Sequence, residues 1–363
     1  MPAAFLVLED GSVHRGEAFG ANIDTAGEVV FNTTMTGYQE VLTDPSYAGQ
    51  LVTLTYPLIG NYGINEIDFE SRRIQVSALV VRQHCDAPSH GSSTRTIHEY
   101  LESEGVPGIS GVDTRAITRR LRSSGVMMGA IASHPDAARA KLEAATSYDE
   151  LDHVRNVMTG TAYDWGGTRQ KAGERPYRVL VTDCGLKYNI LRELTRRGCE
   201  VSVVPADTPA EELLSLNPSG VLLSPGPGDP RMLDYVVENA RRILGRVPVM
   251  GICLGHQIVA RALGAETFKL KFGHRGGNHP VRDMSDGRVY ITAQNHGYAV
   301  KAESLPAGLE VSHINLNDDT VEGLTHRDLP VFTIQYHSEA SPGPRDNEYL
   351  FDRFVTLMDD FKK

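Results

Sequence analysis

The chain has 363 residues, a formal net charge of −10, 40% hydrophobic residues and 23% charged residues. The acidic excess argues against a broad nucleic-acid-binding surface, and no apolar run approaches the roughly 18 residues that a membrane-spanning helix needs. Because the N-terminus lacks the basic start and apolar core of a secretory signal, we expect a cytoplasmic protein, with room for two domains.

Residues 1–150 are predicted to form a β-rich N-terminal domain. Short apolar runs at 5–8, 28–32 and 50–55 are typical of strands, and Asp10-Gly11 is a hairpin signal. The run from 74 to 81 alternates and then becomes apolar, as a buried strand can. Helices are predicted at 92–104 and at 113–122, where Asp113 is a candidate N-cap. The Gly-rich, polar stretch 151–176 is predicted to be the linker between domains.

Residues 177–363 show a regular alternation of strands and helices. The predicted strands are 178–182, 200–204, 221–224 and 247–253, and the helices between and after them are 189–197, 233–244 and 255–263. Further strands are expected at 289–293 and 331–335, with a terminal helix at 345–361. Single helices between short apolar strands indicate an open, mostly parallel α/β sheet with helices on both faces.

The strongest chemical signal is Gly251-Ile252-Cys253-Leu254-Gly255, where a predicted strand runs directly into a helix. G-x-C-x-G at such a junction is the thiol form of the nucleophile elbow, a turn so tight that the positions two residues before and after the nucleophile must be small. At the start of a helix, the aligned peptide dipoles favour a thiolate. None of the four cysteines forms a C-x-x-C pair, so that neither a zinc site nor a thioredoxin motif is indicated.

Two further motifs complete a candidate catalytic centre. His337 and Glu339 follow a predicted strand and are two residues apart, so that in an extended chain they face the same side and form a base with its orienting carboxylate. The loop Ser224-Pro225-Gly226-Pro227-Gly228 follows another buried strand. Its backbone N–H groups, with that of Leu254, are candidates for an oxyanion hole.

In this order and spacing the three motifs resemble the class I, triad-type glutamine amidotransferase domain, from about residue 177 to the C-terminus. The N-terminal half resembles the opening domain of carbamoyl-phosphate synthetase small subunits, in the runs 27–40, 43–47 and 56–63. The runs 272–280 and 294–298 also match that family. The resemblance therefore covers nearly the whole chain. It departs at Ser338, where Pro is common, and at Tyr298, where Phe is also common.

The resemblance implies a glutamine-hydrolysing enzyme with Cys253, His337 and Glu339 as its catalytic triad and no metal in this chain. The glutamine-binding residues that it implies are Ser46, Gly226, Gly228, Leu254, Gln257, Asn295, Gly297 and Tyr298. The implied reaction is attack of the Cys253 thiolate on the glutamine side chain, release of ammonia with a proton from His337, and hydrolysis of the γ-glutamyl thioester.

The resemblance also implies a partner. The chain lacks the G-x-x-x-x-G-K-[ST] phosphate-binding motif, and no cofactor is expected in it. ATP and a divalent metal are expected on a large synthetase subunit, which would receive ammonia through an internal tunnel and make carbamoyl phosphate from bicarbonate. We expect a pair of small and large subunits.

Three alternatives remain at the level of sequence: another triad-type amidotransferase subunit such as that of anthranilate synthase, a cysteine peptidase, or a non-catalytic binding subunit. The N-terminal domain argues against the first and the presence of all three triad residues against the last. A peptidase would need no partner. The sequence leaves open whether the enzyme serves pyrimidine or arginine synthesis, its higher oligomeric state, its effectors and the residues that line the tunnel.

Overall fold

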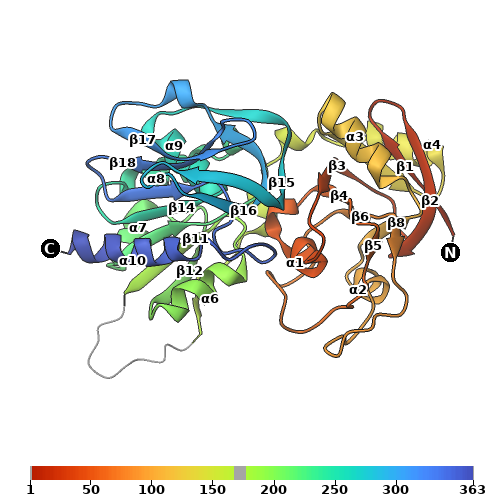
Figure 1. Cartoon of the computed structure of the whole chain (residues 1–363), viewed down its shortest axis with the longest axis horizontal. Coiled ribbons are helices and arrows are strands. Elements are labelled where there is room, and N and C mark those ends of the chain that lie inside the picture. The colour runs from red at the N-terminus through yellow and green to blue at the C-terminus, as the bar shows by residue number, and fades with distance from the viewer. Residues whose placement is uncertain (1, 167–176, 363) are drawn as a thin grey trace. The chain divides into compact units, whose positions relative to one another are not determined.

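A computed structural model describes residues 2–166 and 177–362 (Figure 1). The chain forms two compact units. Unit 1 comprises Met1–His153 and Lys271–Gly276, and unit 2 comprises Val154–Leu270 and Gly277–Lys363. No helix in the described part of the chain is both long and apolar enough to cross a membrane.

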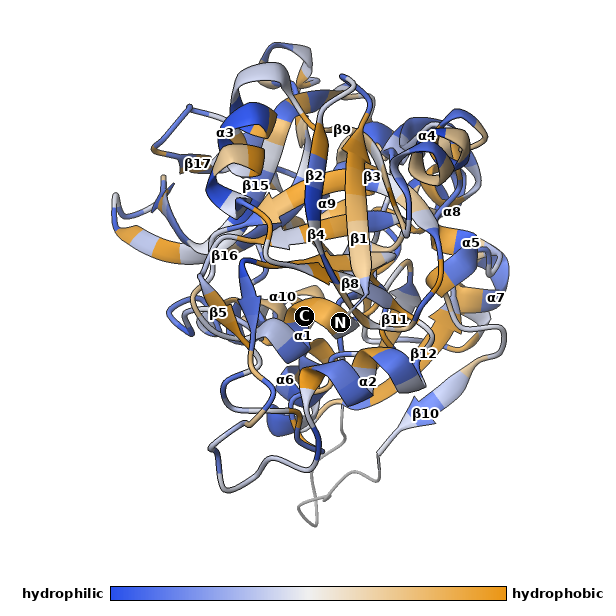
Figure 2. Ribbon diagram, turned by 90° about the vertical axis from the view of Figure 1, so that its right-hand side faces the viewer, coloured by the Kyte–Doolittle hydropathy of each residue, from blue (hydrophilic) through white to orange (hydrophobic). Residues whose placement is uncertain are grey.

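Unit 1 is built on a closed barrel with the strand order β1-β2-β8-β6-β4-β3-β9. Its strands are β1 (Ala3–Leu8), β2 (Val13–Gly20), β3 (Thr25–Asn32), β4 (Gln50–Leu54), β6 (Ala78–Val80), β8 (Pro107–Ser110) and β9 (Met127–Ala132). β1 is hydrophobic along most of its length, whereas β2 is largely hydrophilic (Figure 2). In β2 the exposed Arg15 and Glu17 alternate with the partly buried His14, Gly16 and Ala18, as the two faces of a strand require.

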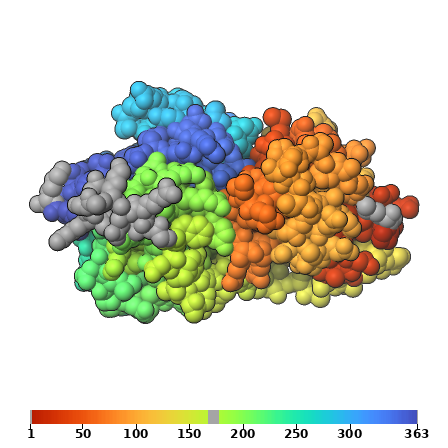
Figure 3. Space-filling view, turned by 90° about the horizontal axis from the view of Figure 1, so that it is seen from below, coloured from red at the N-terminus to blue at the C-terminus, as the bar shows by residue number. Residues whose placement is uncertain are grey.

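Helices and short strands cover the barrel. They are α1 (Tyr38–Thr43), η1 (Pro45–Tyr47), β5 (Leu58–Ile59), β7 (Gln83–His84), α2 (Ile97–Ser103), α3 (Thr114–Ser124), α4 (Pro135–Glu143) and η2 (Tyr148–Glu150). The segments between α1 and α2, in orange, make up much of one face of this unit in the space-filling view (Figure 3). Asp113 caps α3 by accepting a hydrogen bond from the amide of Ala116 at 2.9 Å, which confirms the predicted N-cap.

Unit 2 contains a ten-stranded sheet in the order β10-β12-β11-β13-β14-β19-β18-β16-β15-β17. Its strands are β10 (Tyr163–Trp165), β11 (Arg178–Asp183), β12 (Glu200–Pro205), β13 (Gly220–Leu223), β14 (Val249–Ile252), β15 (Thr267–Asp283), β16 (Val289–Val300), β17 (Leu309–Asn315), β18 (Val321–His326) and β19 (Val331–Ile334). The run from β12 to β19 is parallel, whereas β10 and β18 join it antiparallel. The sheet is therefore mixed, and the predicted parallel part is its centre.

Helices flank this sheet (Figure 1). They are α5 (Val154–Val157), α6 (Tyr188–Arg196), α7 (Ala210–Ser215), η3 (Pro230–Met232), α8 (Asp234–Ile243), α9 (Leu254–Leu263), η4 (Ala302–Ser304) and α10 (Tyr349–Phe361). Successive residues of β11 belong to different cores. Leu180 packs in the core that holds α7, α8 and α9, whereas Val179 and Val181 pack in the core that holds α6 and α10. Because these strands are buried on both faces of the sheet, they appear in the sequence as continuous apolar runs.

Several predicted elements differ from the structure. The strand predicted at 74–81 is only Ala78–Val80, although Ile74 and Val76 are buried. The described part of the predicted linker forms α5 and β10, and β10 pairs with β12; the rest of it, 167–176, lies outside the described residues. The strand predicted at 289–293 extends to Val300.

Candidate active site

The carboxyl ends of three parallel strands bring the candidate residues to one edge of the sheet. Leu223 of β13 is paired with Gly251 of β14, and Ile252 of β14 is paired with Ile334 of β19. The residues that follow these positions therefore leave the sheet together. They are the loop after Leu223, the residue Cys253 and the segment that contains His337. In open α/β sheets this edge is the usual place for ligands.

Cys253 joins β14 to α9 in a strained conformation. It is the N-cap of α9 with φ +53° and ψ −105°, values that non-glycine residues rarely adopt, and its side chain is buried. A Cβ atom on Gly251 would lie 2.7 Å from the carbonyl oxygen of Gly255, and one on Gly255 would lie 2.1 Å from that of Leu223. Both glycines are therefore required by the close packing of this turn, as the motif predicts.

His337 and Glu339 form a buried pair. The Nδ1 atom of His337 lies 2.6 Å from Oε1 of Glu339, and both side chains are at most 3% exposed. The amide of His337 donates a hydrogen bond to the carbonyl oxygen of Ala293 in β16, which holds the segment against the sheet. The pair forms with Ser338 between its members, at the position where the resembling family commonly has proline.

Lys187 extends this pair and was not singled out from the sequence. Its Nζ atom lies 3.0 Å from Oε1 of Glu339 and donates a hydrogen bond of 2.6 Å to the carbonyl oxygen of Ala340, and its side chain is 2% exposed. A lysine in the sequence gives no sign of such burial, because most lysines lie at the surface. The one indication in the sequence is that Lys187 follows β11 closely, which places it at the same edge of the sheet as the candidate residues.

Opposite charges set the protonation of this cluster. Burial lowers the pKa of His337 most strongly and the charge of Lys187 lowers it further, but the negative charge of Glu339 and the close interactions with Cys253 and Glu339 together raise the pKa to about 10. Cys253 is one of the groups that act on this imidazole, which places the thiol near it, although Nε2 of His337 makes no hydrogen bond among the described residues. Burial raises the pKa of Glu339, but the charges of Lys187 and His337 lower it to about 2. The cluster therefore holds an imidazolium beside a carboxylate.

This charge arrangement predicts a pH-dependent stability. A histidine whose pKa is raised by folding stabilises the protein fully below its unfolded pKa, near 6.5, and loses that contribution as pH rises through the folded value of about 10. We expect His337→Asn to lower the free energy of unfolding most at pH 6 and progressively less toward pH 10. Urea unfolding followed by the fluorescence of Trp165, the only tryptophan, reports on unit 2.

Asn239→Ala is the matched control for this measurement. Asn239 joins α8 to the start of α7 by two hydrogen bonds that involve no titrating group, with Thr208 and Ala210. The decrease in the free energy of unfolding caused by Asn239→Ala should therefore be the same at every pH. A His337→Asn difference that stays equally constant from pH 6 to pH 10 would contradict the assigned charge.

The loop after β13 packs against the start of α9. A Cβ atom on Gly226 would lie 2.2 Å from the carbonyl oxygen of Cys184 and 2.7 Å from Cδ2 of Leu254, so that only glycine fits. Gly228 has φ +92°, which also favours glycine. Leu254 is the first residue of α9, where the amides of a helix have no partner within the helix. The loop and this helix start therefore lie together beside Cys253.

The remaining predicted ligands of unit 2 lie on α9 and β16. Gln257 donates hydrogen bonds from Nε2 to the carbonyl oxygen of Tyr298 at 2.9 Å and to Oε1 of Gln335 at 3.0 Å. The thiol of Cys253 lies 3.6 Å from the carbonyl oxygen of Asn295. Gly297 is half-buried between Asn295 and Tyr298 on the same strand. The structure thus places Asn295 beside Cys253 and joins Tyr298 to α9 through Gln257, whose amide nitrogen is used by the protein itself.

Ser46 lies in unit 1, in the helical turn η1. Its amide donates a hydrogen bond of 2.9 Å to Oδ1 of Asp44, which caps the turn. Its hydroxyl takes no part in this cap: Oγ is buried and has no hydrogen-bond partner among the described residues. A turn alone therefore accounts for the backbone of Ser46 but leaves its hydroxyl unexplained.

Comparisons with known proteins match both units. Residues 6–131 match the family model of the CPSase domain of the carbamoyl-phosphate synthase small chain, and residues 180–357 match that of class-I glutamine amidotransferases. A carbamoyl phosphate synthase small chain of Symbiobacterium thermophilum is 55% identical over 97% of this chain and 98% of its own. That of Bacillus caldolyticus is 53% identical over 99% and 97%. A pyrimidine-specific small chain of Bacillus subtilis is 50% identical over 99% and 96%.

Proposed function

Because the chain belongs to the family of carbamoyl-phosphate synthase small chains, we propose that it hydrolyses glutamine and supplies ammonia to a large, ATP-dependent synthetase subunit. The observation that carries this proposal is the cluster at the sheet edge: a cysteine at a strained strand–helix junction beside the buried pair His337 and Glu339. Nucleophile, proton carrier and orienting carboxylate are the parts that acyl transfer through a thioester requires.

In the proposed mechanism the Cys253 thiolate attacks the side-chain carbonyl carbon of glutamine. The attacking sulfur lies at the start of α9, with the charged His337 near it. The imidazolium then donates its proton to the departing ammonia. Water, deprotonated by the now neutral His337, cleaves the thioester to glutamate. Glu339 holds the imidazole through Nδ1, and Lys187 holds Glu339 in turn.

Backbone amides are the proposed oxyanion hole. The amide of Leu254 lies at the start of α9, and the loop packs against Leu254 at Gly226. Such donors stabilise the charge of the tetrahedral intermediate because they are fixed before the reaction begins. Asn295, Gly297, Tyr298 and Gln257 are the proposed ligands of the glutamine itself, together with Ser46.

Ser46 offers a test of the contribution of unit 1. We propose that the hydroxyl of Ser46 hydrogen-bonds the charged amino-acid end of glutamine. A hydrogen bond to a charged group contributes roughly 1.5–3 kcal/mol, so that Ser46→Ala should raise the glutamine KM about tenfold to a hundredfold. The turnover number should change less, because the same contact is made in the ground state and the transition state. Steady-state kinetics of glutamate release measures both.

Ser71→Ala is the control for Ser46→Ala. Ser71 is also a buried serine of unit 1, but its hydroxyl donates a hydrogen bond of 2.6 Å to the carbonyl oxygen of Thr43. This variant should cost stability and leave the glutamine KM unchanged. If Ser46→Ala behaves in the same way, the hydroxyl of Ser46 does not bind glutamine.

We propose no cofactor for this chain. ATP, a divalent metal and the bicarbonate-consuming steps belong to the proposed large subunit, which receives ammonia directly from the small one. Copurification with a large ATP-binding chain is the simplest test of this division. A small chain that releases glutamate from glutamine and supports no carbamoyl phosphate synthesis with any such partner would contradict it.

A further inference from the structure

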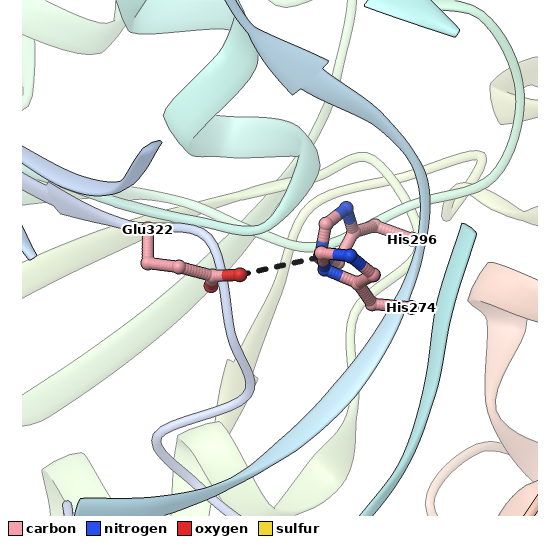
Figure 4. Close-up of side chains that lie close together, drawn as sticks. All are labelled: His274, His296 and Glu322. Atoms are coloured by element: carbon pink, nitrogen blue, oxygen red, sulfur yellow. Dashed lines mark ion pairs between the residues drawn. The ribbon is translucent and has the colours of Figure 1, made fainter. Parts of the chain in front are cut away.

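Glu322 of β18 is a fully buried carboxylate that the proposed mechanism does not use. Its Oε2 atom accepts a hydrogen bond of 3.0 Å from Nε2 of Gln294, and its Oε1 atom accepts one of 2.9 Å from Nδ2 of Asn315. Figure 4 shows the carboxylate facing His296, whose Nε2 atom lies 3.9 Å from Oε1. Two amides stabilise a buried carboxylate but do not balance its charge, and a buried charge is costly without an opposite one.

The hydrogen bonds of His296 identify that opposite charge. Nδ1 of His296 lies 2.7 Å from the carbonyl oxygen of Tyr298, and Nε2 lies 2.9 Å from Oε1 of Gln294. The orientation of the Gln294 amide follows from its nitrogen, which donates to Thr292 and to Glu322. Both ring nitrogens of His296 thus face oxygens that only accept hydrogen bonds. Only the imidazolium carries a proton on both nitrogens, so that His296 is a cation paired with Glu322.

This charge state leaves the pair unsuited to bind a metal ion. An imidazolium has no nitrogen lone pair to offer to a metal ion. The cation instead acts on its own strand. The proton on Nδ1 is donated to Tyr298, whose carbonyl oxygen also accepts the hydrogen bond from Gln257, and His296 stands between Asn295 and Gly297.

We propose that Glu322 is a positioning residue for glutamine, which acts by holding His296 as an imidazolium and thereby fixing the strand segment 295–298. This inference rests on the proposed function, since that segment carries three of the proposed glutamine ligands. Without the carboxylate, His296 loses a proton and releases either Tyr298 or Gln294. The binding surface then loosens while the triad, on other segments, stays intact.

Glu322→Gln tests the role because it keeps the shape and removes the charge. In Glu322→Gln one carboxylate oxygen is replaced by an NH₂ group. That group must face the amide nitrogen of either Gln294 or Asn315, so that one of these two hydrogen bonds is lost as well. In the complex with the large subunit, we expect the glutamine KM to rise about tenfold or more and kcat to change much less, which is the signature of lost binding in the ground state. Asn239→Ala, in the same unit, controls for a general loss of stability.

A double-variant cycle tests whether Glu322 acts through His296. His296→Asn alone should also raise the glutamine KM, and adding Glu322→Gln to it should raise KM little further, because the two residues form one unit. Independent, multiplying effects would contradict action through His296. A Glu322→Gln variant that lowers kcat at unchanged KM, or shifts KM no more than Asn239→Ala, would overturn the positioning role.

The charge of His296 can be measured without any assay of activity. In ¹⁵N-histidine-labelled protein at pH 7, both ring nitrogens of His296 should carry protons, with the resonances assigned by their loss in His296→Asn. In Glu322→Gln one of the two nitrogens should lose its proton. A neutral His296 in the unaltered protein would overturn the inference, whatever the kinetics show. A protein with this imidazolium but no glutaminase activity would instead refute the proposed function.

Discussion

In the assembled synthetase, Cys253→Ser should abolish glutamine-dependent formation of carbamoyl phosphate and leave ammonia-dependent formation intact. A serine hydroxyl in the same strained turn is far less acidic than a thiol, so that the nucleophile is lost while the fold is kept. The loss should be at least about a thousandfold, as for other variants that remove a nucleophile acting with its base. Synthesis assays with glutamine or with ammonium as nitrogen source measure the two activities separately.

Cys199→Ser is the matched control for Cys253→Ser. Cys199 is equally buried in unit 2, but burial raises the pKa of its thiol to about 11, so that it is not a nucleophile at neutral pH. This variant should retain both activities. Loss of both activities in a properly assembled Cys253→Ser complex would contradict the division of labour between a glutaminase chain and a synthetase chain.

His337→Asn should have the second largest effect, and a different kinetic signature. The imidazole transfers protons only as bonds to nitrogen break and bonds to water form, so that its loss should lower kcat roughly 10²- to 10⁴-fold with a smaller change in the glutamine KM. In the proposed mechanism the raised pKa of His337 suits the resting residue to donate the proton that ammonia release requires. Steady-state glutamate release by the assembled complex gives both constants.

Glu339→Gln is the companion variant to His337→Asn. In the proposed mechanism Glu339 orients His337 and does not transfer a proton itself, so that the fall in kcat should be smaller than for His337→Asn. Equal damage from Glu339→Gln and Cys253→Ser would mean that the carboxylate takes a direct part in the chemistry. The roles of His337 and Glu339 would then have to be reassigned.

The candidate residues at the carboxyl edge of the sheet could be predicted from the sequence because each depends on the residues next to it in the chain. Gly251 and Gly255 mark the tight turn around Cys253 because no other residue fits the distances found there, and the two-residue spacing of His337 and Glu339 is a property of any extended chain. The parallel centre of the sheet was predictable because its strands are apolar on both faces. These features depend on residues within a few positions of each other.

Features that depend on distant partners were not predictable. The long strand β15 is polar over much of its length, and its pairing with β17 joins residues about thirty positions apart, so that neither alternation nor an apolar run marked it. Strand β10 lies in a Gly-rich stretch that has no strand pattern, and it forms because it pairs with the distant strand β12. Lys187 and Glu322 look like ordinary surface charges in the sequence, and only the fold shows that both are buried, beside the segments proposed to act in catalysis and glutamine binding.

The most direct test of the central claim is to trap the acyl-enzyme. Labelled glutamine is mixed with the assembled complex, the reaction is quenched in acid within a turnover, and the digested protein is analysed by mass spectrometry. The mechanism predicts one glutamyl group on the peptide that contains Cys253, released by mild base and absent from Cys253→Ser. A glutamyl group on another residue, or none on Cys253 while glutamate is being released, would contradict the mechanism.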